Sequence, residues 1–147
     1  KEIKAVKILL AVDGSKYSLD AVDCLIEHAD WYREKPAVEL LTVHLPVPKL
    51  PRMHLVVGKN QIERYYREEG EAMQAGTKKK LGAAGIRYNP SILVGPIAET
   101  IVAHAKKTRC DLIFIGTHGR TAAGNMLLGS VATKVLHIST IPVLLVR

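Results

Sequence analysis

The chain has 147 residues, of which 48% are hydrophobic and 24% are charged, the composition of an ordinary globular protein. A single domain over residues 1–147 is the simplest organisation for this length. No apolar run approaches the roughly 20 residues of a membrane-spanning helix, and the first residues lack the apolar core of a signal peptide. We therefore expect a cytoplasmic protein without a membrane partner.

The formal net charge of +7 would attract phosphate groups, but the basic residues are dispersed along the chain. The run from Lys78 to Lys80 falls in a charged segment that is typical of a solvated helix face, and few aromatic residues accompany the basic ones. We expect no nucleic-acid partner. Cys24 and Cys110 lack the spacing of a metal site or a disulfide framework, so we expect them to be small core residues.

Apolar runs and segments with helical periodicity alternate along the whole chain. Ser15 is a plausible N-cap of the first helix, Gly82 and Gly85 should end the second, and Pro90 favours an edge position for its strand. The expected elements are a strand at 4–12, a helix from 15 to about 34, a strand at 38–45, a helix from 60 to about 81, a strand at 86–94, a helix at 96–108, a strand at 111–115, a helix at 129–138 and a strand at 142–146.

Strict alternation of strands and helices predicts an α/β fold with a doubly wound parallel sheet of five strands between four helices. Pro46, Pro48 and Pro51 make the stretch 46–59 a long extended connection rather than a helix, and such connections are often functional. In a sheet of this kind, ligands bind beyond the carboxyl ends of the strands, where the strand order reverses.

Two glycines follow the fourth predicted strand, and a third glycine begins the next helix. Gly116 and Gly119 follow the strand, and after nine intervening residues Gly129 precedes Ser130 and Val131. Glycine lets a ligand approach the main chain, and a helix N-terminus offers unpaired N–H groups to a phosphate. This arrangement predicts a phosphate cradle, although a simple helix start with Ser130 at the cap would also explain part of it.

Other phosphate-binding and catalytic arrangements are missing from the sequence. There is no G-x-x-x-x-G-K-[ST] loop and no G-x-G-x-x-G after the first strand. Around the predicted cradle only Asp13, His118 and Ser130 are candidates for chemistry, and no triad or carboxylate pair can be assigned from their spacing. We expect no catalytic residues, no metal-binding residues and at most slow hydrolysis of a bound nucleotide.

The glycine spacing, G-2x-G-9x-G-[ST], resembles the nucleotide-binding signature of the universal stress protein family. Residues 6–15 resemble its opening strand and turn, 93–96 the exit of its third strand, and 141–146 its closing strand. The resemblance implies the strand order 3-2-1-4-5 of a Rossmann-like, adenine nucleotide α-hydrolase-like fold. It also implies a stress-response regulatory or signalling module that binds ATP or AMP between the first and fourth strands, with Mg²⁺ or Mn²⁺ as an optional bridge to ATP.

The resemblance also assigns roles to individual residues. Asp13 would contact the nucleoside, which we favour over the alternative that it helps to cap the first helix or the turn. The Val43 main chain would contact the adenine edge, and Gly95 would either contact the ligand or only allow a turn. The full set of expected nucleotide-binding residues is Asp13, Gly14, Ser15, Val43, Gly95, Gly116, His118, Gly119, Arg120, Gly129, Ser130 and Val131.

Three further expectations concern assembly and the alternatives. The family resemblance implies a homodimer that forms through the C-terminal strand at 141–146. One alternative function is an interaction module that has lost nucleotide binding. The other is an ATP-dependent enzyme of the adenine nucleotide α-hydrolase superfamily, for which the residues from Asp13 to Ser18 are at best a partial phosphate loop.

Overall fold

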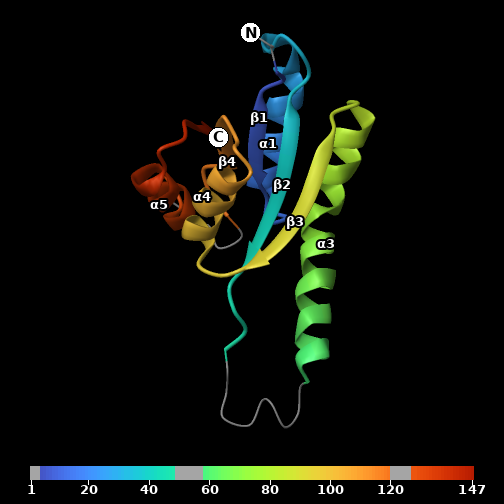
Figure 1. The fold of residues 1–147 in the computed structure, drawn as a ribbon, viewed down its shortest axis with the longest axis vertical. Coiled ribbons are helices and arrows are strands. Elements are labelled where there is room, and N and C mark those ends of the chain that lie inside the picture. Colours follow the sequence, from blue (N-terminus) through green and yellow to red (C-terminus); the bar gives the residue numbers. More distant parts are fainter. Residues whose placement is uncertain (1–3, 49–57, 120–126) are drawn as a thin grey trace.

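A computed structural model describes residues 4–48, 58–119 and 127–147. Its strands form one parallel five-stranded sheet in the order β3-β2-β1-β4-β5, as the sequence and the family resemblance predicted (Figure 1). The elements are β1 Lys7–Ala11, α1 Lys16–Glu27, the 3₁₀ helix η1 Ala29–Trp31, β2 Ala37–His44, α3 Lys59–Ala83, β3 Tyr88–Val94, α4 Ile97–Lys107, β4 Leu112–Gly116, α5 Ser130–Ile138 and β5 Val143–Val146.

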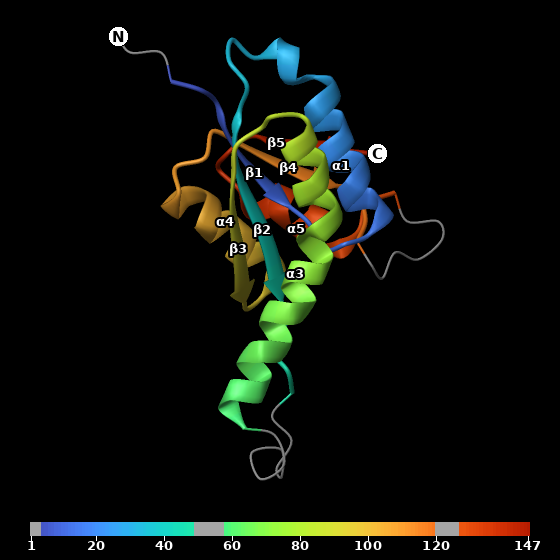
Figure 2. The ribbon, with the colours of Figure 1, turned by 90° about the vertical axis from the view of Figure 1, so that its right-hand side faces the viewer.

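The central strand β1 carries side chains into a separate hydrophobic core on each face of the sheet. Leu10 packs with Leu25 and Leu81 under α1 and α3, whereas Leu9 packs with residues of α4 and α5 such as Val135. All of these side chains are fully buried. Figure 2 shows the two helix layers on opposite sides of the sheet. A strand covered on both faces explains the nearly continuous apolar run of β1.

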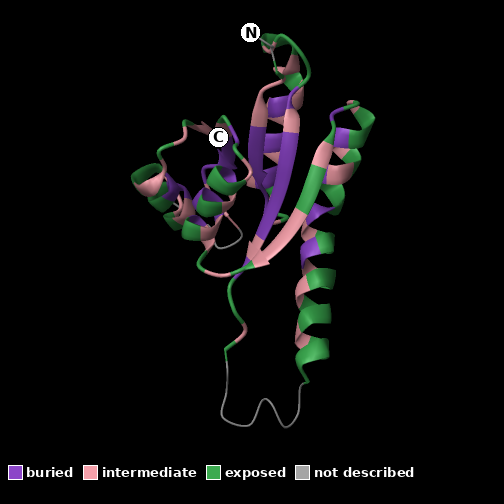
Figure 3. Cartoon of the chain, viewed as in Figure 1, coloured by how far each residue is buried: buried purple, intermediate pink, exposed green. Residues whose placement is uncertain are grey.

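The two edge strands differ from the buried centre. β3 is one edge of the sheet, and its Pro90 lies opposite Leu40 of β2. An edge strand forms hydrogen bonds with one neighbour only, so it tolerates a proline that has no backbone N–H to donate. Figure 3 shows that β3 is more exposed than β1 and β2. The edge position that Pro90 predicted is therefore confirmed, and β5 forms the opposite edge.

The first helix is shorter than the periodicity predicted. It ends at Glu27, and His28 caps it through its backbone N–H, which donates to the Cys24 carbonyl. The last large apolar residue of α1 that packs against the core is Ile26, and the next one in the sequence, Trp31, is 74% exposed. Burial therefore gives no support to another turn of α-helix, and the short η1 follows instead.

The second predicted helix is slightly longer than expected. Gly82 lies inside α3, and the chain turns at Gly85, which has a φ of +67°. Glycine suits this left-handed position because it has no Cβ to collide with the backbone. None of the helices in the described ranges combines the length and apolar content that a membrane crossing requires.

Both cysteines pack as the sequence predicted. Cys110 is buried in the core under α4, and Cys24 is partly buried against the core under α1. Burial raises the pKa of each thiol, with a further increase for Cys24 from the nearby Glu27 carboxylate. Both side chains therefore stay protonated at neutral pH, which suits a packing role.

Candidate functional site

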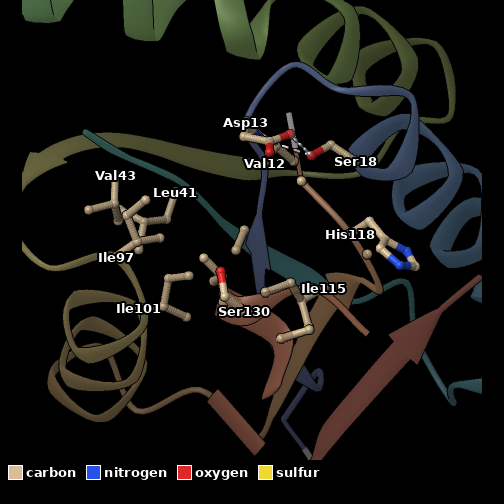
Figure 4. Close-up of a pocket in the computed structure, with 16 residues that line it drawn as sticks. Val12, Asp13, Ser18, Leu41, Val43, Ile97, Ile101, Ile115, His118 and Ser130 are labelled. Carbon is tan, nitrogen blue, oxygen red and sulfur yellow. Dashed lines mark hydrogen bonds between the residues drawn. The ribbon is translucent and has the colours of Figure 1, made fainter. Parts of the chain in front are cut away.

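A cavity of about 340 Å³ lies at the carboxyl ends of β1 and β4, where the strand order reverses (Figure 4). One part of its lining is apolar and comes from the sheet and from α4 and α5. The apolar residues are Ala11, Val12, Leu41, Val43, Ile97, Ile101, Ile115, Val131 and Ala132. The remaining lining residues are Asp13, Ser18, Gly116, His118, Gly119, Gly129 and Ser130. The cavity thus joins an apolar compartment to a polar, glycine-rich one.

Asp13 organises the turn between β1 and α1 from the edge of this cavity. Its Oδ1 accepts hydrogen bonds from the Ser15 backbone N–H, at 2.9 Å, and from the Ser18 hydroxyl, at 2.8 Å. Ser15 in turn caps α1 by accepting from the Ser18 backbone N–H at 3.3 Å, which confirms its predicted capping role. The capping role proposed for Asp13 is therefore also confirmed.

Asp13 nevertheless lines the cavity, so capping does not remove it from the candidate site. Its second carboxylate oxygen, Oδ2, lies 2.8 Å from the position that a Cβ on Gly119 would occupy. Gly14 and Ser15 are outside the lining and act in the turn, which Gly14 allows with a φ of +82°. Their contact with a ligand stays a prediction.

The three glycines of the signature are each held against main-chain or polar atoms. A Cβ on Gly116 would lie 2.7 Å from the Tyr17 carbonyl oxygen, and one on Gly129 would lie 3.2 Å from the Thr117 carbonyl oxygen. The Gly129 N–H donates to that same oxygen at 2.7 Å, which joins the start of α5 to the end of β4. The spacing therefore has a packing reason, because larger residues would push the strand end, the loop and the helix start apart.

The N-terminus of α5 opens onto the cavity. Gly129, and not Ser130, is the N-cap residue, and glycine has no side chain that could cap the helix. Ser130, Val131 and Ala132 form the first turn and all line the cavity. The N–H groups of a first helical turn have no partner within the helix, and together they carry a partial positive charge. This geometry can accept an anion.

His118 lies in the loop after β4 and lines the cavity. Its ring lies toward α1, where its centroid is 5.0 Å from that of Tyr17 (Figure 4). Its Nδ1 is 3.1 Å from the Thr117 hydroxyl. Asp13 and His118 are the titratable residues among the described cavity lining. Arg120, the remaining predicted loop residue, lies outside the described residues.

Two other predictions gain a structural reading. Gly95 does not line the cavity, and a Cβ there would lie 2.8 Å from the Thr100 hydroxyl oxygen, so the turn explains this glycine. Val43 does line it, beside Leu41 from the same face of β2 (Figure 4). Ile97 and Ile101, one turn apart on α4, complete this wall. The sequence analysis did not identify Leu41, Ile97 and Ile101 as lining residues. Two signals were available: Leu41 is two residues from Val43, which puts both on one face of a strand, and Ile97 is four residues from Ile101, which puts both on one face of a helix.

Comparison with known proteins identifies the family of the chain. The model of the universal stress protein family matches residues 5–147. The chain belongs to the universal stress protein family. Among curated members, universal stress protein YxiE of Bacillus subtilis is 31% identical over 149 residues, covering 96% of this chain and 98% of YxiE.

Solved structures agree with this assignment. The structure of MJ0577 from Methanocaldococcus jannaschii superposes with a TM-score of 0.79 at 30% identity, over 98% of this chain and 96% of that one. A universal stress protein crystallised in complex with cAMP has a TM-score of 0.65 at 26% identity, with 97% of each chain covered. At least one member of the family thus binds an adenine nucleotide.

The described part of the chain shows no cluster of three or more His, Cys, Asp or Glu side chains that could hold a metal ion. Of the 46–59 connection that the sequence predicted to be extended, residues 49–57 lie outside the described ranges, and 46–48 are irregular, as predicted.

Proposed function

We propose that this protein binds ATP or AMP in the cavity between β1 and β4, and acts as a nucleotide-dependent regulatory module in the stress response. The supporting observation is that one cavity joins an apolar compartment to the open N-terminus of α5 and to the glycine loop. A purine suits the first compartment, and a phosphate suits the second. The cAMP complex of a 26% identical family member supports the same class of ligand.

Each part of the nucleotide would meet a different set of residues. The base would lie against the apolar wall that includes Val43 and Ile101, and the ribose would lie beside Asp13. The phosphates would accept hydrogen bonds from the backbone N–H groups of Ser130 and Val131 and from the Ser130 hydroxyl. A Mg²⁺ or Mn²⁺ ion would bind through the phosphate oxygens of ATP, since the described residues offer no cluster of their own.

We expect hydrolysis of this nucleotide to be slow at most. Phosphoryl transfer needs groups that position the nucleophile and hold the metal. Of the two titratable residues in the described lining, Asp13 already accepts two hydrogen bonds in the α1 turn, and the His118 ring packs on Tyr17. A steady turnover of ATP comparable to that of a dedicated ATPase would instead favour the enzyme alternative.

A thermal-shift experiment with ATP, AMP, adenosine, GTP and NAD, with and without Mg²⁺, tests this proposal. A ligand at 100 times its Kd adds about 2.7 kcal/mol to the free energy of unfolding, which raises Tm by several degrees. We expect ATP or AMP to raise Tm and GTP not to do so. No shift with any nucleotide, in protein shown by chromatography to be nucleotide-free, would favour the interaction module without a ligand.

The matched variants are Ser130→Asp and Ser130→Asn. The structure argues against a bulky residue at Gly129 as the test, because its Cβ would collide with the loop and disturb folding. Ser130 is exposed at the first turn of α5, where a carboxylate favours the helix but repels phosphate. We expect Ser130→Asp to abolish the shift with ATP and to preserve that with adenosine, while Ser130→Asn retains both. Equal ATP binding by the two variants would contradict the proposed phosphate position.

We also propose that two copies pair through β5. This strand is an edge of the sheet, and Val143, Leu144 and Leu145 are only partly buried in the single chain. An edge strand presents unpaired N–H and C=O groups, and apolar side chains there favour pairing with a second strand. Antiparallel pairing of two β5 strands would form a symmetric homodimer with a continuous sheet.

A further inference from the structure

Among the described residues, most of the basic side chains outside the helices and strands belong to the connections that lead into the strands. In a parallel sheet these connections all meet at the amino edge, opposite the nucleotide cavity. Five exposed basic residues stand there, namely Lys4, Arg33, Lys35, Arg87 and Arg109. The described connections at the carboxyl edge, 12–15, 45–48, 58, 95–96, 117–119 and 127–129, contain no Lys or Arg. We call the five residues, together with Trp31, the amino-edge surface.

The strand pairing places these residues side by side. The Val38 N–H donates to the Arg87 carbonyl, and the Ala37 N–H donates to the Val6 carbonyl, so the entries to β3, β2 and β1 are adjacent. The Lys35 ammonium donates to the Ala84 carbonyl at 2.9 Å, which ties the entry of β2 to the end of α3. Since neighbouring strands are about 4.8 Å apart, the surface extends roughly 14 Å from β3 to β4.

These charges have no ion-pair partner among the described residues. The salt bridges of that part of the chain involve Lys7, Lys59, Lys80 and Lys134, and none of the five residues of the amino-edge surface. Arg109 also adopts a left-handed backbone with a φ of +58°, a conformation that glycine would adopt more easily. Arg109 therefore occupies a backbone conformation in which glycine would be more favourable.

Trp31 adds a large apolar side chain to the same surface. It is 74% exposed, and its ring centroid is 4.0 Å from that of His28 at the end of α1. Figure 1 shows η1 and the last turn of α3 at the same end of the molecule, away from the first turn of α3. Exposed tryptophan and arginine are the side chains that most often dominate the binding energy of protein interfaces.

From these observations we infer that the amino-edge surface docks an acidic segment of a partner protein. Asp30, Glu34 and Asp111 are interspersed among the basic residues. Such carboxylates would repel the continuous charge of a nucleic-acid backbone, whereas a protein segment can present mixed charges to match them. This inference does not depend on nucleotide binding, because the surface lies at the other end of the strands.

Trp31 provides a direct test, because it is the single tryptophan of the chain. A ten-residue peptide in which lysines interrupt a glutamate sequence is titrated at low ionic strength while the fluorescence of Trp31 is recorded, because such a peptide has net negative charge and can also match the carboxylates of the surface. We expect a saturable change whose affinity falls as salt is added, since exposed charges are screened. The absence of a saturable change would overturn the inference, as would tighter binding of a single-stranded decanucleotide, which would identify a polynucleotide surface instead.

Two double variants with the same change of net charge separate a local surface from a general charge effect. Arg33→Glu with Arg87→Glu alters the amino-edge surface, whereas Arg64→Glu with Arg67→Glu alters exposed residues in the first half of α3. We expect the first pair to weaken peptide binding at least tenfold and the second to change it less than twofold, with both proteins folded by circular dichroism. Equal losses would overturn the inference.

Discussion

Single residues in this protein often meet a structural demand and line the candidate site at the same time. Asp13 accepts hydrogen bonds from Ser15 and Ser18 and also lines the cavity. Gly129 fits against the Thr117 carbonyl and also brings the first turn of α5 to the cavity. Substitution of either residue would therefore change folding and binding together, which is why Ser130 is the better position for a binding test.

Arg109 shows the opposite case, in which a residue works against its backbone. The left-handed conformation is unfavourable for a side chain with a Cβ, so Arg109→Gly should raise the free energy of unfolding by about 1 kcal/mol. Urea denaturation followed by circular dichroism measures this change. Arg87→Gly, in an exposed connection outside the left-handed region, is the control and should not stabilise the protein. A destabilised Arg109→Gly protein would mean that the arginine side chain contributes more than the strain costs.

At the scale of elements, α3 consists of two unlike halves. Its buried residues are Gly70, Gln74, Thr77 and Leu81, all from the middle of the helix onward. In the first half, the rings of Tyr65 and Tyr66 contact His44 at the end of β2. Figure 2 shows the first turns extending beyond the sheet. The charged, weakly apolar sequence of the first half explains why it has no fully buried residue, whereas Gly70 allows the second half to lie close to β3.

The close approach of α3 to β3 predicts opposite effects for two glycines of the same helix. A Cβ on Gly70 would lie 2.7 Å from side-chain atoms of Ile92, whereas one on Gly82 would have no atom within 4 Å. We expect Gly70→Ala to destabilise the protein by about 1–3 kcal/mol through overpacking. Gly82→Ala should stabilise it by up to about 1 kcal/mol through helix propensity. Thermal unfolding of the two variants measures both changes, and a stabilised Gly70→Ala protein would contradict the packing.

For the whole molecule, the parallel sheet separates two surfaces with different chemistry. The carboxyl edge holds the cavity and the open N-terminus of α5, and the amino edge holds the basic residues and Trp31. Within the described connections between elements, the basic residues lie at the amino edge, away from the cavity.

The assembly proposed through β5 is also a property of the whole molecule. Light scattering at micromolar concentration should give twice the mass of the 16.1 kDa chain. Leu144→Lys with Leu145→Glu changes no net charge, and it should convert the dimer to a monomer if the edge strand forms the interface. The control is Asn89→Lys with Pro90→Glu, at exposed positions of the other edge strand, β3, and it should leave the dimer intact. Ser91 and Ile92 are less suitable for this control, because they are partly buried and Ile92 packs under α3. A wild-type monomer would refute the proposal.

Much of this fold follows from local features of the sequence. The apolar runs and their spacing predicted every strand, and Pro90 predicted an edge strand because proline cannot donate to a second neighbour. The glycine spacing and Asp13 predicted a site at the carboxyl ends of the first and fourth strands, and the structure has a cavity there, but its use as a binding site stays a prediction. The end of α1 was the main error, because nothing local showed that Trp31 would remain exposed.

The rest depended on which elements the tertiary structure brought together. The apolar wall of Leu41, Ile97 and Ile101 joins β2 to α4, and each residue on its own resembles an ordinary core residue. The amino-edge surface likewise gathers residues from four strand entries that are dispersed along the chain. Local sequence determines the conformation of a segment, whereas a cavity or a surface arises from distant segments. Only the packing of the sheet decides which of those segments become neighbours.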